Sequence, residues 1–204
     1  MSEGPYLASE DSALLRAALV GYSGESCLEI GAGNGGNLIA LAKGFEIVVG
    51  TDVVRPSMAD WREKSDFVLA DRAACLRSGS FDLVAFNPPY LEGDETGDVA
   101  VEGGRRLEVP RAFLSEAFRV VKGDGKVVFL VNGAMDVEEV RAACGEWGFG
   151  LRLLTSHRVF FEVLSVYEAA RRAGEEHAAR SEERKAAVGM HGPGSPAPIA
   201  RVTN

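Results

Sequence analysis

The chain has 204 residues, of which 46% are hydrophobic and 25% charged, and its formal net charge is −8. These values indicate one folded domain and exclude a fibrous or wholly disordered protein. No apolar stretch approaches the roughly 18 residues of a membrane span, and the first ten residues do not resemble a secretion signal, so we predict a cytoplasmic protein without membrane association. The acidic balance argues against a nucleic-acid partner.

The first predicted strand, residues 26–30, runs directly into the glycine-rich sequence EIGAGNGG at residues 29–36. Glycine lets a chain turn sharply and approach a bound ligand where a Cβ atom would collide with it. This loop, with Glu29, Gly31 and Gly33 as its candidate contacts, therefore predicts a cofactor site at the start of the following helix. Its spacing also satisfies the dinucleotide pattern, so the loop alone leaves NAD as an alternative.

Two more acidic residues follow the next predicted strands, residues 46–51 and 67–70. Asp52 can accept both hydroxyl groups of a ribose. Asp71 can accept from an adenine amino group, while the backbone amide of Arg72 donates to the ring nitrogen. With the glutamate of the glycine loop, three acids thus lie at the ends of three successive strands. Such a set suits a cationic, adenosine-bearing ligand better than a pyrophosphate, which prefers neutral amides and a helix dipole.

The fourth predicted strand, residues 81–86, leads into the tetrad Asn87-Pro88-Pro89-Tyr90. The two prolines fix the backbone and donate no N–H, so this corner offers acceptors. The Asn87 side-chain oxygen and the Pro88 carbonyl can each take one N–H of a planar NH2 group, while Tyr90 packs on that group. The nitrogen lone pair then faces a sulfonium methyl, as in S-adenosylmethionine, for in-line displacement, and no base is needed before methyl transfer.

Two helices with apolar stripes follow, at residues 109–122 and 136–147, and the second opens with an aspartate cap. Between them lies a fifth predicted strand at residues 126–131. Two further β-runs, at residues 151–155 and 161–167, are joined by a connection too short for a parallel crossover, so they should pair antiparallel. Alternating strands and helices predict an α/β fold with a mostly parallel sheet.

After Tyr167 the composition changes to alanine, glutamate and arginine without an apolar stripe, and then to glycine and proline. We predict a catalytic domain over residues 1–168 and, over residues 169–204, a solvated helix followed by a flexible, dispensable tail. The cysteines and histidines show neither a disulfide framework nor zinc-ligand spacing, so no metal is expected.

The sequence resembles the HemK-like protein-(glutamine-N5) methyltransferases that modify class I translation release factors, in the branch without a separate N-terminal domain. The resemblance runs from about Pro5 to Tyr167 and rests on six sequence runs: YLASEDS at 6–12, CLEIGAG at 27–33, TD at 51–52, AD at 70–71, FDLVAFNPPY at 81–90 and FFEVLSV at 160–166. It implies a Rossmann-like class I methyltransferase fold, in which the last strand of a seven-stranded, mostly parallel sheet runs antiparallel.

In that family, S-adenosylmethionine donates the methyl group and the side-chain amide nitrogen of a glutamine in a release factor receives it. The matching positions imply cofactor contacts at Ser12, Glu29, Gly31, Asp52, Asp71 and Asn87. They imply a substrate site at Asn87, Pro88, Pro89, Tyr90 and Leu91. The resemblance also implies a small zinc-binding activator subunit along the third-strand edge, residues 66–70.

Three other functions remain as alternatives. An N6-adenine-type nucleic-acid methyltransferase also acts on a planar NH2 group, but the acidic core and the lack of room for a target-recognition domain count against it. A nicotinamide oxidoreductase would use the glycine loop and Asp52 but has no need of the tetrad. A binding module with a degenerate pocket is disfavoured because the loop, the acids and the tetrad are all intact.

Overall fold

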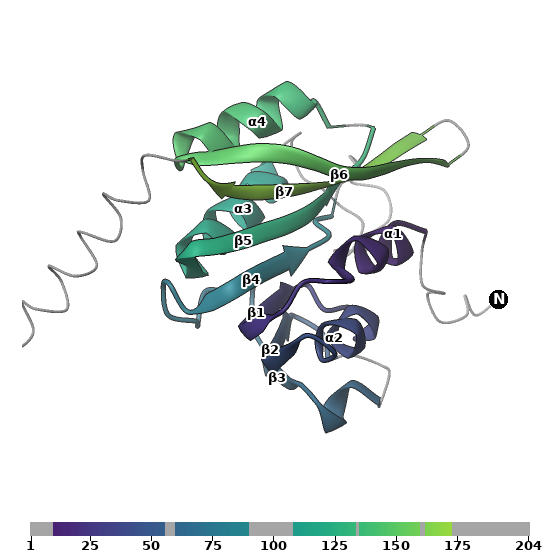
Figure 1. Cartoon of the computed structure of the whole chain (residues 1–204), viewed down its shortest axis with the longest axis vertical. Helices are drawn as coiled ribbons and strands as arrows, with labels where there is room; N and C mark the ends of the chain where they lie inside the picture. The colour runs from purple at the N-terminus through teal and green to yellow at the C-terminus, as the bar shows by residue number, and fades with distance from the viewer. Residues whose placement is uncertain (1–9, 56–59, 90–107, 134, 160–161, 173–204) are drawn as a thin grey trace, which may run out of the picture.

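The computed structural model describes residues 10–55, 60–89, 108–133, 135–159 and 162–172, with side chains except at residues 60, 61, 108 and 109. In these ranges the chain forms a seven-stranded sheet in the order β3-β2-β1-β4-β5-β7-β6 (Figure 1). The strands are β1 Gly24–Ile30, β2 Phe45–Asp52, β3 Asp66–Leu69, β4 Phe81–Phe86, β5 Val121–Val131, β6 Phe149–Val159 and β7 Glu162–Arg171.

The directions of the strands confirm the predicted fold class. The first five strands of the chain pair parallel to one another, whereas β7, the last in sequence, runs antiparallel to both β5 and β6. The chain places β2 on one side of β1 and later returns to place β4 on the other side of β1. Ligands bind outside the carboxyl ends of strands at such a switch point, so the fold itself locates the candidate site beside β1 and β4.

Helices cover both faces of the sheet in the described part of the chain (Figure 1). They are α1 Glu10–Leu19 and α2 Gly36–Leu41 on one face, and α3 Glu108–Val120 and α4 Val137–Glu146 on the other, with a 3-10 turn, η1 Asp60–Glu63. Alternate strand residues face the two layers: Leu28 and Val84 pack with α3 and α4, whereas Cys27 and Leu83 pack with α1 and α2. All four side chains are buried, as strands covered on both sides require.

The predicted aspartate cap of α4 is confirmed. Asp136 has an extended backbone conformation, and its carboxylate accepts the N–H of Glu138 at 2.8 Å. Two predicted boundaries before this cap were wrong. The helix α3 ends at Val120 rather than at residue 122, and β5 begins at Val121 rather than at residue 126. Gly125 permits this longer strand, since a Cβ atom there would lie 2.9 Å from backbone oxygens of β4.

The last strand also extends further than predicted. Residues 169–171, expected to begin a helix outside the domain, belong to β7: all three pair with β6, and residues 169 and 170 also pair with β5. Ala169 lies between Val127 and Leu151 and is fully buried. Its backbone is paired on both sides, and this tertiary pairing outweighs the helical preference of an Ala- and Arg-rich sequence. The rest of the predicted tail, residues 173–204, lies outside the described residues.

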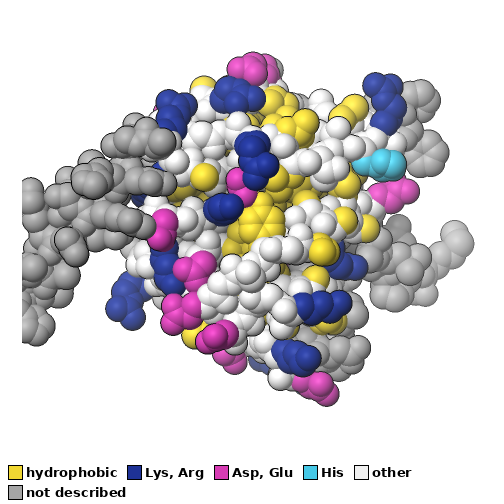
Figure 2. Space-filling model, viewed as in Figure 1, with side chains coloured by type: hydrophobic (Ala, Val, Ile, Leu, Met, Phe, Trp, Pro, Cys, Tyr) yellow, Lys and Arg dark blue, Asp and Glu magenta, His cyan; other side chains and the backbone are white. Residues whose placement is uncertain are grey.

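Charges of both signs share the molecular surface. On the face shown in Figure 2, Lys and Arg side chains are interspersed with Asp and Glu, and hydrophobic side chains are exposed between them. Among the described residues, this view therefore shows no continuous basic stripe of the kind that nucleic-acid binding requires. Within the described ranges, no helix is long and apolar enough to cross a membrane.

Candidate active site

Three strand ends lie side by side at the switch point of the sheet. Ile30 of β1 pairs with Thr51 of β2 on one side and with Phe86 of β4 on the other. Parallel strands in this register end at the same level. The next residue along each of them therefore reaches the same edge of the sheet: Gly31, Asp52 and Asn87.

The glycine loop turns tightly over the end of β2. Gly31, Gly33 and Gly35 have φ angles of 75°, 52° and 85°, in the left-handed region that favours glycine. The N–H groups of Gly31 and Ala32 both donate to the Thr51 carbonyl, at 2.8 and 3.0 Å. The loop is thus anchored to the neighbouring strand, and α2 begins directly after it, as predicted.

Asp52 organises the same loop from the end of β2. One carboxylate oxygen accepts the Gly33 N–H at 2.8 Å, and the other accepts the Val54 N–H at 3.0 Å. Each carboxylate oxygen can accept more than one hydrogen bond, so this half-buried side chain can also take donors from a ligand. The structure therefore places Asp52 where the sequence predicted it, with an additional role in shaping the glycine loop.

Glu29 is the most deeply buried acid at this edge, with 3% of its surface exposed. Its Oε1 accepts from Asn37 Nδ2 at 2.7 Å, whereas its Oε2 is buried without a hydrogen-bond partner among the described residues. Burial raises the pKa of Glu29 to about 8, and the hydrogen bond from Asn37 and the charge of Arg16 offset this only in part. Without a ligand, this carboxyl group is mostly protonated at neutral pH.

Two residues of this cluster were missed by the sequence analysis. Arg16, on α1, donates from Nε to Asn37 Oδ1 at 3.2 Å, and Asn37 in turn holds Glu29. A Cβ atom at Gly36 would lie 2.5 Å from Arg16 Nη2, so this glycine makes room for the arginine. Asn37 in the first turn after the loop was a visible signal, but its link to a helix 21 positions earlier was not.

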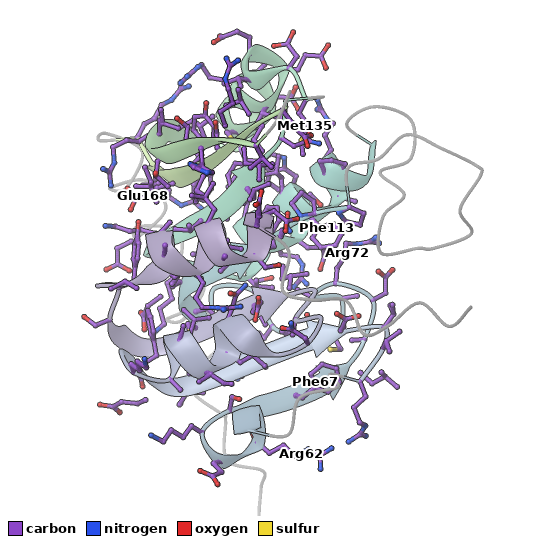
Figure 3. The ribbon with its side chains drawn as sticks, turned by 90° about the vertical axis from the view of Figure 1, so that its right-hand side faces the viewer. Arg62, Phe67, Arg72, Phe113, Met135 and Glu168 are labelled. Atoms are coloured by element: carbon purple, nitrogen blue, oxygen red, sulfur yellow. The ribbon has the colours of Figure 1, made fainter. Side chains whose placement is uncertain are left out.

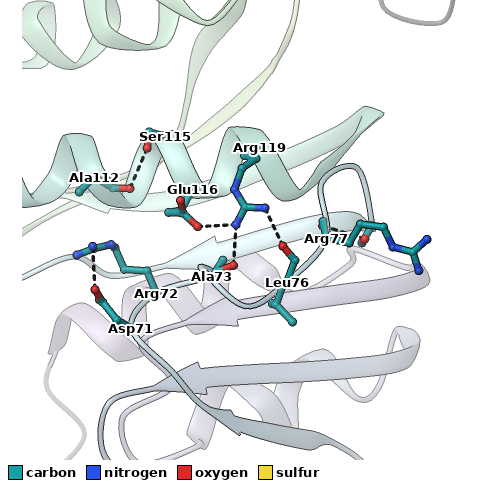
Figure 4. A network of polar contacts seen from close by, with 10 residues as sticks. Asp71, Arg72, Ala73, Leu76, Arg77, Ala112, Ser115, Glu116 and Arg119 are labelled. Carbon is teal, nitrogen blue, oxygen red and sulfur yellow. Dashed lines mark hydrogen bonds and ion pairs between the residues drawn. The ribbon is translucent and has the colours of Figure 1, made fainter. Parts of the chain in front are cut away.

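The loop after β3 carries Asp71 and Arg72. Asp71 is exposed and pairs with the Arg72 guanidinium at 2.9 Å, and Arg72 has the unusual φ angle of 50° for a residue other than glycine. Arg119 of α3 holds this loop, because it donates to the carbonyls of Ala73 and Leu76, each at 2.7 Å (Figure 4). The sequence pattern gave no indication of this anchor.

Asn87 follows β4 and contacts the first turn of α1. Its Nδ2 donates to Asp11 Oδ2 at 2.9 Å, while its Oδ1 is buried and has no partner among the described residues. The other carboxylate oxygen of Asp11 accepts the backbone N–H of Ser12 at 2.7 Å. The predicted contacts Ser12 and Asn87 are thus brought together through Asp11, a residue to which the sequence analysis gave no role.

The remaining tetrad residues are described only in part. Pro88 is buried and Pro89 is half-buried directly after the end of β4. Tyr90 and Leu91, predicted to contact the substrate, lie outside the described residues. In the described part of the chain, no cluster of three or more His, Cys, Asp or Glu side chains could hold a metal ion.

A second polar cluster lies away from this edge. Glu168 accepts from Tyr22 at 2.6 Å and from Arg152 at 2.8 Å. Burial favours the protonated form of Glu168, but these hydrogen bonds outweigh it and lower the pKa of this carboxyl. Figure 3 shows Glu168 on the opposite side of the molecule from Arg72 and from Phe113, whose ring is beside Gly31. This cluster ties Tyr22, in the turn between α1 and β1, to the last two strands and is separate from the candidate site.

Two buried polar oxygens of the site have no hydrogen-bond partner among the described residues. They are Glu29 Oε2 and Asn87 Oδ1. Asp52 ends β2, which pairs with β1 on the side opposite β4. A buried polar group without a hydrogen-bond partner costs about 1–3 kcal/mol. A ligand that brings N–H or O–H donors and positive charge would remove this cost. These acceptors therefore fit the amino group and ribose of S-adenosylmethionine better than a pyrophosphate.

Comparison with known proteins identifies the family. No protein-family model matches the chain. A protein of Methanocaldococcus jannaschii, named as a candidate protein N5-glutamine methyltransferase, is 30% identical over 181 residues, which cover 81% of this chain and 91% of that protein. The chain belongs to the protein N5-glutamine methyltransferases. This confirms the family inferred from the sequence and favours it over the nucleic-acid methyltransferase and oxidoreductase alternatives.

Solved structures of methyltransferases share the fold. A chain of the E. cuniculi Mtq2-Trm112 complex, which is described as methylating the translation termination factor eRF1, is 28% identical with a TM-score of 0.68, covering 82% of this chain and 98% of that one. The T. thermophilus 16S rRNA N2 G1207 methyltransferase, solved with AdoMet and guanosine, is 23% identical with a TM-score of 0.60, covering 82% of this chain and 44% of that one. The second likeness concerns the fold alone.

Proposed function

We propose that this methyltransferase transfers the methyl group of S-adenosylmethionine to the side-chain amide nitrogen of a glutamine in a class I translation release factor. The observation that carries the proposal is the buried, unpartnered Oδ1 of Asn87 at the end of β4. The named activity of the M. jannaschii relative and the eRF1 substrate of the Mtq2-Trm112 complex support it.

Each acid at the sheet edge is proposed to bind a different part of the cofactor. Glu29 Oε2 is the acceptor for its ammonium group, and Asp52 accepts from the ribose hydroxyls. Asp71 and the backbone amide of Arg72 take the adenine, and Ser12 closes the site from α1. When bound, S-adenosylmethionine supplies an electrophilic methyl group on a positively charged sulfur. The surrounding carboxylates attract this positive charge.

The tetrad orients the acceptor nitrogen. Asn87 Oδ1 and the Pro88 carbonyl each accept one N–H of the glutamine amide, so the face of the nitrogen that carries the lone pair is presented for in-line attack. Neither proline offers an N–H that would compete for these acceptors. Tyr90 and Leu91, which lie outside the described residues, are further proposed contacts of the substrate. The methylated nitrogen loses its extra proton after transfer, so Asn87 needs to act only as an acceptor.

The test is a labelling experiment with three pools of acceptor. The protein is incubated with S-adenosylmethionine labelled on the methyl group and with a class I release factor, total protein or RNA. We expect label in the release factor, at one glutamine located by mass spectrometry. Asn87→Ala should lower turnover by about two to three orders of magnitude while changing cofactor affinity little, because it removes one oriented polar group. Label in RNA alone would instead favour the N6-adenine-type alternative.

We also propose that a small zinc-binding activator subunit binds along β3. This strand lies at the edge of the sheet and pairs only with β2 in the described structure. Leu69 at its end is 63% exposed, and the neighbouring Val53 and Val54 are 55% and 68% exposed. An unpaired edge with exposed apolar side chains suits a partner that adds a strand. The Mtq2-Trm112 complex of E. cuniculi supports the presence of a partner subunit.

A further inference from the structure

We propose that Asp11 is a positioning residue for methyl transfer, which locks the Asn87 amide so that its oxygen, and not its nitrogen, faces the acceptor. The inference rests on the proposed role of Asn87 and adds a residue on another element to it. Asp11 lies in the first turn of α1, 76 positions before Asn87 in the chain. It acts through Asn87 and does not itself contact the substrate.

The contacts of Asp11 leave its carboxylate little freedom. The side chain is 6% exposed, its Oδ1 accepts the Ser12 N–H at 2.7 Å, and its Oδ2 accepts from Asn87 Nδ2 at 2.9 Å. A carboxylate held by a backbone amide of its own helix is a fixed acceptor. The Nδ2 end of the Asn87 amide is therefore directed toward α1.

The opposite end of the same amide is the one proposed to work in catalysis. A primary amide carries an acceptor on one side and two donors on the other, in nearly the same shape. Rotation by half a turn would place Oδ1 against the Asp11 carboxylate and Nδ2 against the N–H groups of the acceptor. Both contacts are repulsive. Asp11 thus selects the one orientation in which the buried, unpartnered Oδ1 can accept from the substrate.

A double-mutant cycle tests this role. Asp11→Ala should lower kcat by about 10- to 100-fold and change the Kd for S-adenosylmethionine by less than about threefold, because it loosens an oriented group without removing it. In the Asn87→Ala background, the same change should cost less than about twofold, since no amide is left to orient. Glu10→Ala is the matched control: Glu10 is exposed in the same helical turn and should leave kcat unchanged. An equal loss in both backgrounds would refute the positioning role.

Reversal of the hydrogen bond is the second test. Asn87→Asp places two carboxylates within hydrogen-bond distance of each other, and their repulsion should drive the side chain at position 87 out of place. Adding Asp11→Asn restores a donor and an acceptor with exchanged roles and still leaves a free oxygen at position 87. The double variant should recover at least about tenfold in kcat over Asn87→Asp. No recovery, with both proteins folded, would overturn the proposal.

A readout that needs no turnover separates this proposal from the proposed function. In 15N-labelled protein, the Asn87 side-chain NH2 should exchange slowly with solvent, and Asp11→Ala should accelerate this exchange while Glu10→Ala does not. The kinetic cycle is run on whichever acceptor the wild-type protein methylates. If that acceptor is not a release factor, the proposed function fails, but the orientation of the Asn87 amide by Asp11 is still tested. If the exchange rate is unchanged in Asp11→Ala, the positioning role of Asp11 fails by itself.

Discussion

Glu29 shows how a single buried carboxyl can prepare a site for a cation. It sits on a fully covered strand, takes one hydrogen bond from Asn37, and keeps its second oxygen unpaired in the described structure. Because burial raises its pKa to about 8, the empty site holds a neutral acid and avoids a buried, unbalanced negative charge. A bound ammonium group would favour the ionised form and return the pKa toward its usual range.

Cofactor binding at pH 7 should therefore release about one proton from Glu29. The measurement is titration calorimetry of S-adenosylmethionine in buffers with different ionisation enthalpies, where proton release makes the observed heat depend on the buffer. Glu29→Gln should remove this dependence and weaken binding. A buffer-independent heat in the wild-type protein would contradict the proposed contact between Glu29 and the ammonium group.

The same group has a predictable effect on the stability of the empty protein. Its pKa is 4.5 when unfolded and about 8 when folded, so between these values the folded chain holds a proton that the unfolded chain has lost. The free energy of unfolding should consequently fall as pH rises through this window, and Glu29→Gln should flatten that fall. Urea denaturation of both proteins at a series of pH values measures the difference.

At the scale of elements, the connection between β3 and β4 depends on a side chain from a helix. Arg119 of α3 donates to the carbonyls of Ala73 and Leu76, and its guanidinium is held in turn by Glu116 at 2.6 Å. The backbone of this connection also joins α3 through Ser80, whose N–H donates to the Val120 carbonyl. Asp71 and Arg72, the predicted adenine contacts, therefore owe their position to α3.

Arg119→Met should lower the free energy of unfolding by about 1–3 kcal/mol, because it leaves two carbonyls without their charged donor. It should also weaken S-adenosylmethionine binding more than it lowers kcat, since it disturbs the adenine side of the site and not the tetrad. Arg111→Met is the control on the same helix, because the ion pair of Arg111 with Glu146 is exposed, and about 0–1 kcal/mol is usual for such a pair. Equal effects of the two variants would exclude the proposed anchor.

At the scale of the whole molecule, the sheet extends to Arg171, further along the chain than the Ala- and Arg-rich composition after Tyr167 predicts. The effect of truncating the chain follows from this. A chain that stops after Arg172 keeps every described pair of β7. One that stops after Glu168 loses the pairs of residues 169–171 with β6 and those of residues 169 and 170 with β5. The longer form should keep its melting temperature within about 2 °C, and the shorter form should lose about 2–4 kcal/mol of stability. Thermal unfolding of the two proteins tests this, and equal melting temperatures would show that the end of β7 adds nothing.

The two edges of the sheet should also differ in function. Leu69→Lys on β3 should abolish binding of the proposed activator subunit, because it places a charge in the proposed apolar contact. Leu153→Lys is the matched control, since Leu153 is 51% exposed on β6, the strand at the opposite edge. Co-purification of each variant with the partner measures the effect. Loss of the partner from both variants, or from neither, would refute binding along β3.

Much of the site was already determined by local sequence rules. Closely spaced glycines after an apolar run require a turn with left-handed backbone angles, and Gly31, Gly33 and Gly35 adopt them. Two prolines after a strand end its hydrogen-bond ladder, so the tetrad could only follow β4. Five strands with apolar runs and alternating helical patterns sufficed for the fold class. These features depend on neighbours within a few residues, which the sequence displays directly.

Only the tertiary structure decided which groups hold these features in place. Asp11 reaches Asn87 across 76 positions, Arg16 reaches Asn37 across 21, and neither pair follows a period that a sequence pattern could reveal. The length of β7 was decided in the same way, because the strands on its two sides pair its backbone. Hydrogen-bond partners from separate elements are chosen by sheet order and helix packing. Periodicity indicates which face of an element is buried, but not what that face will meet.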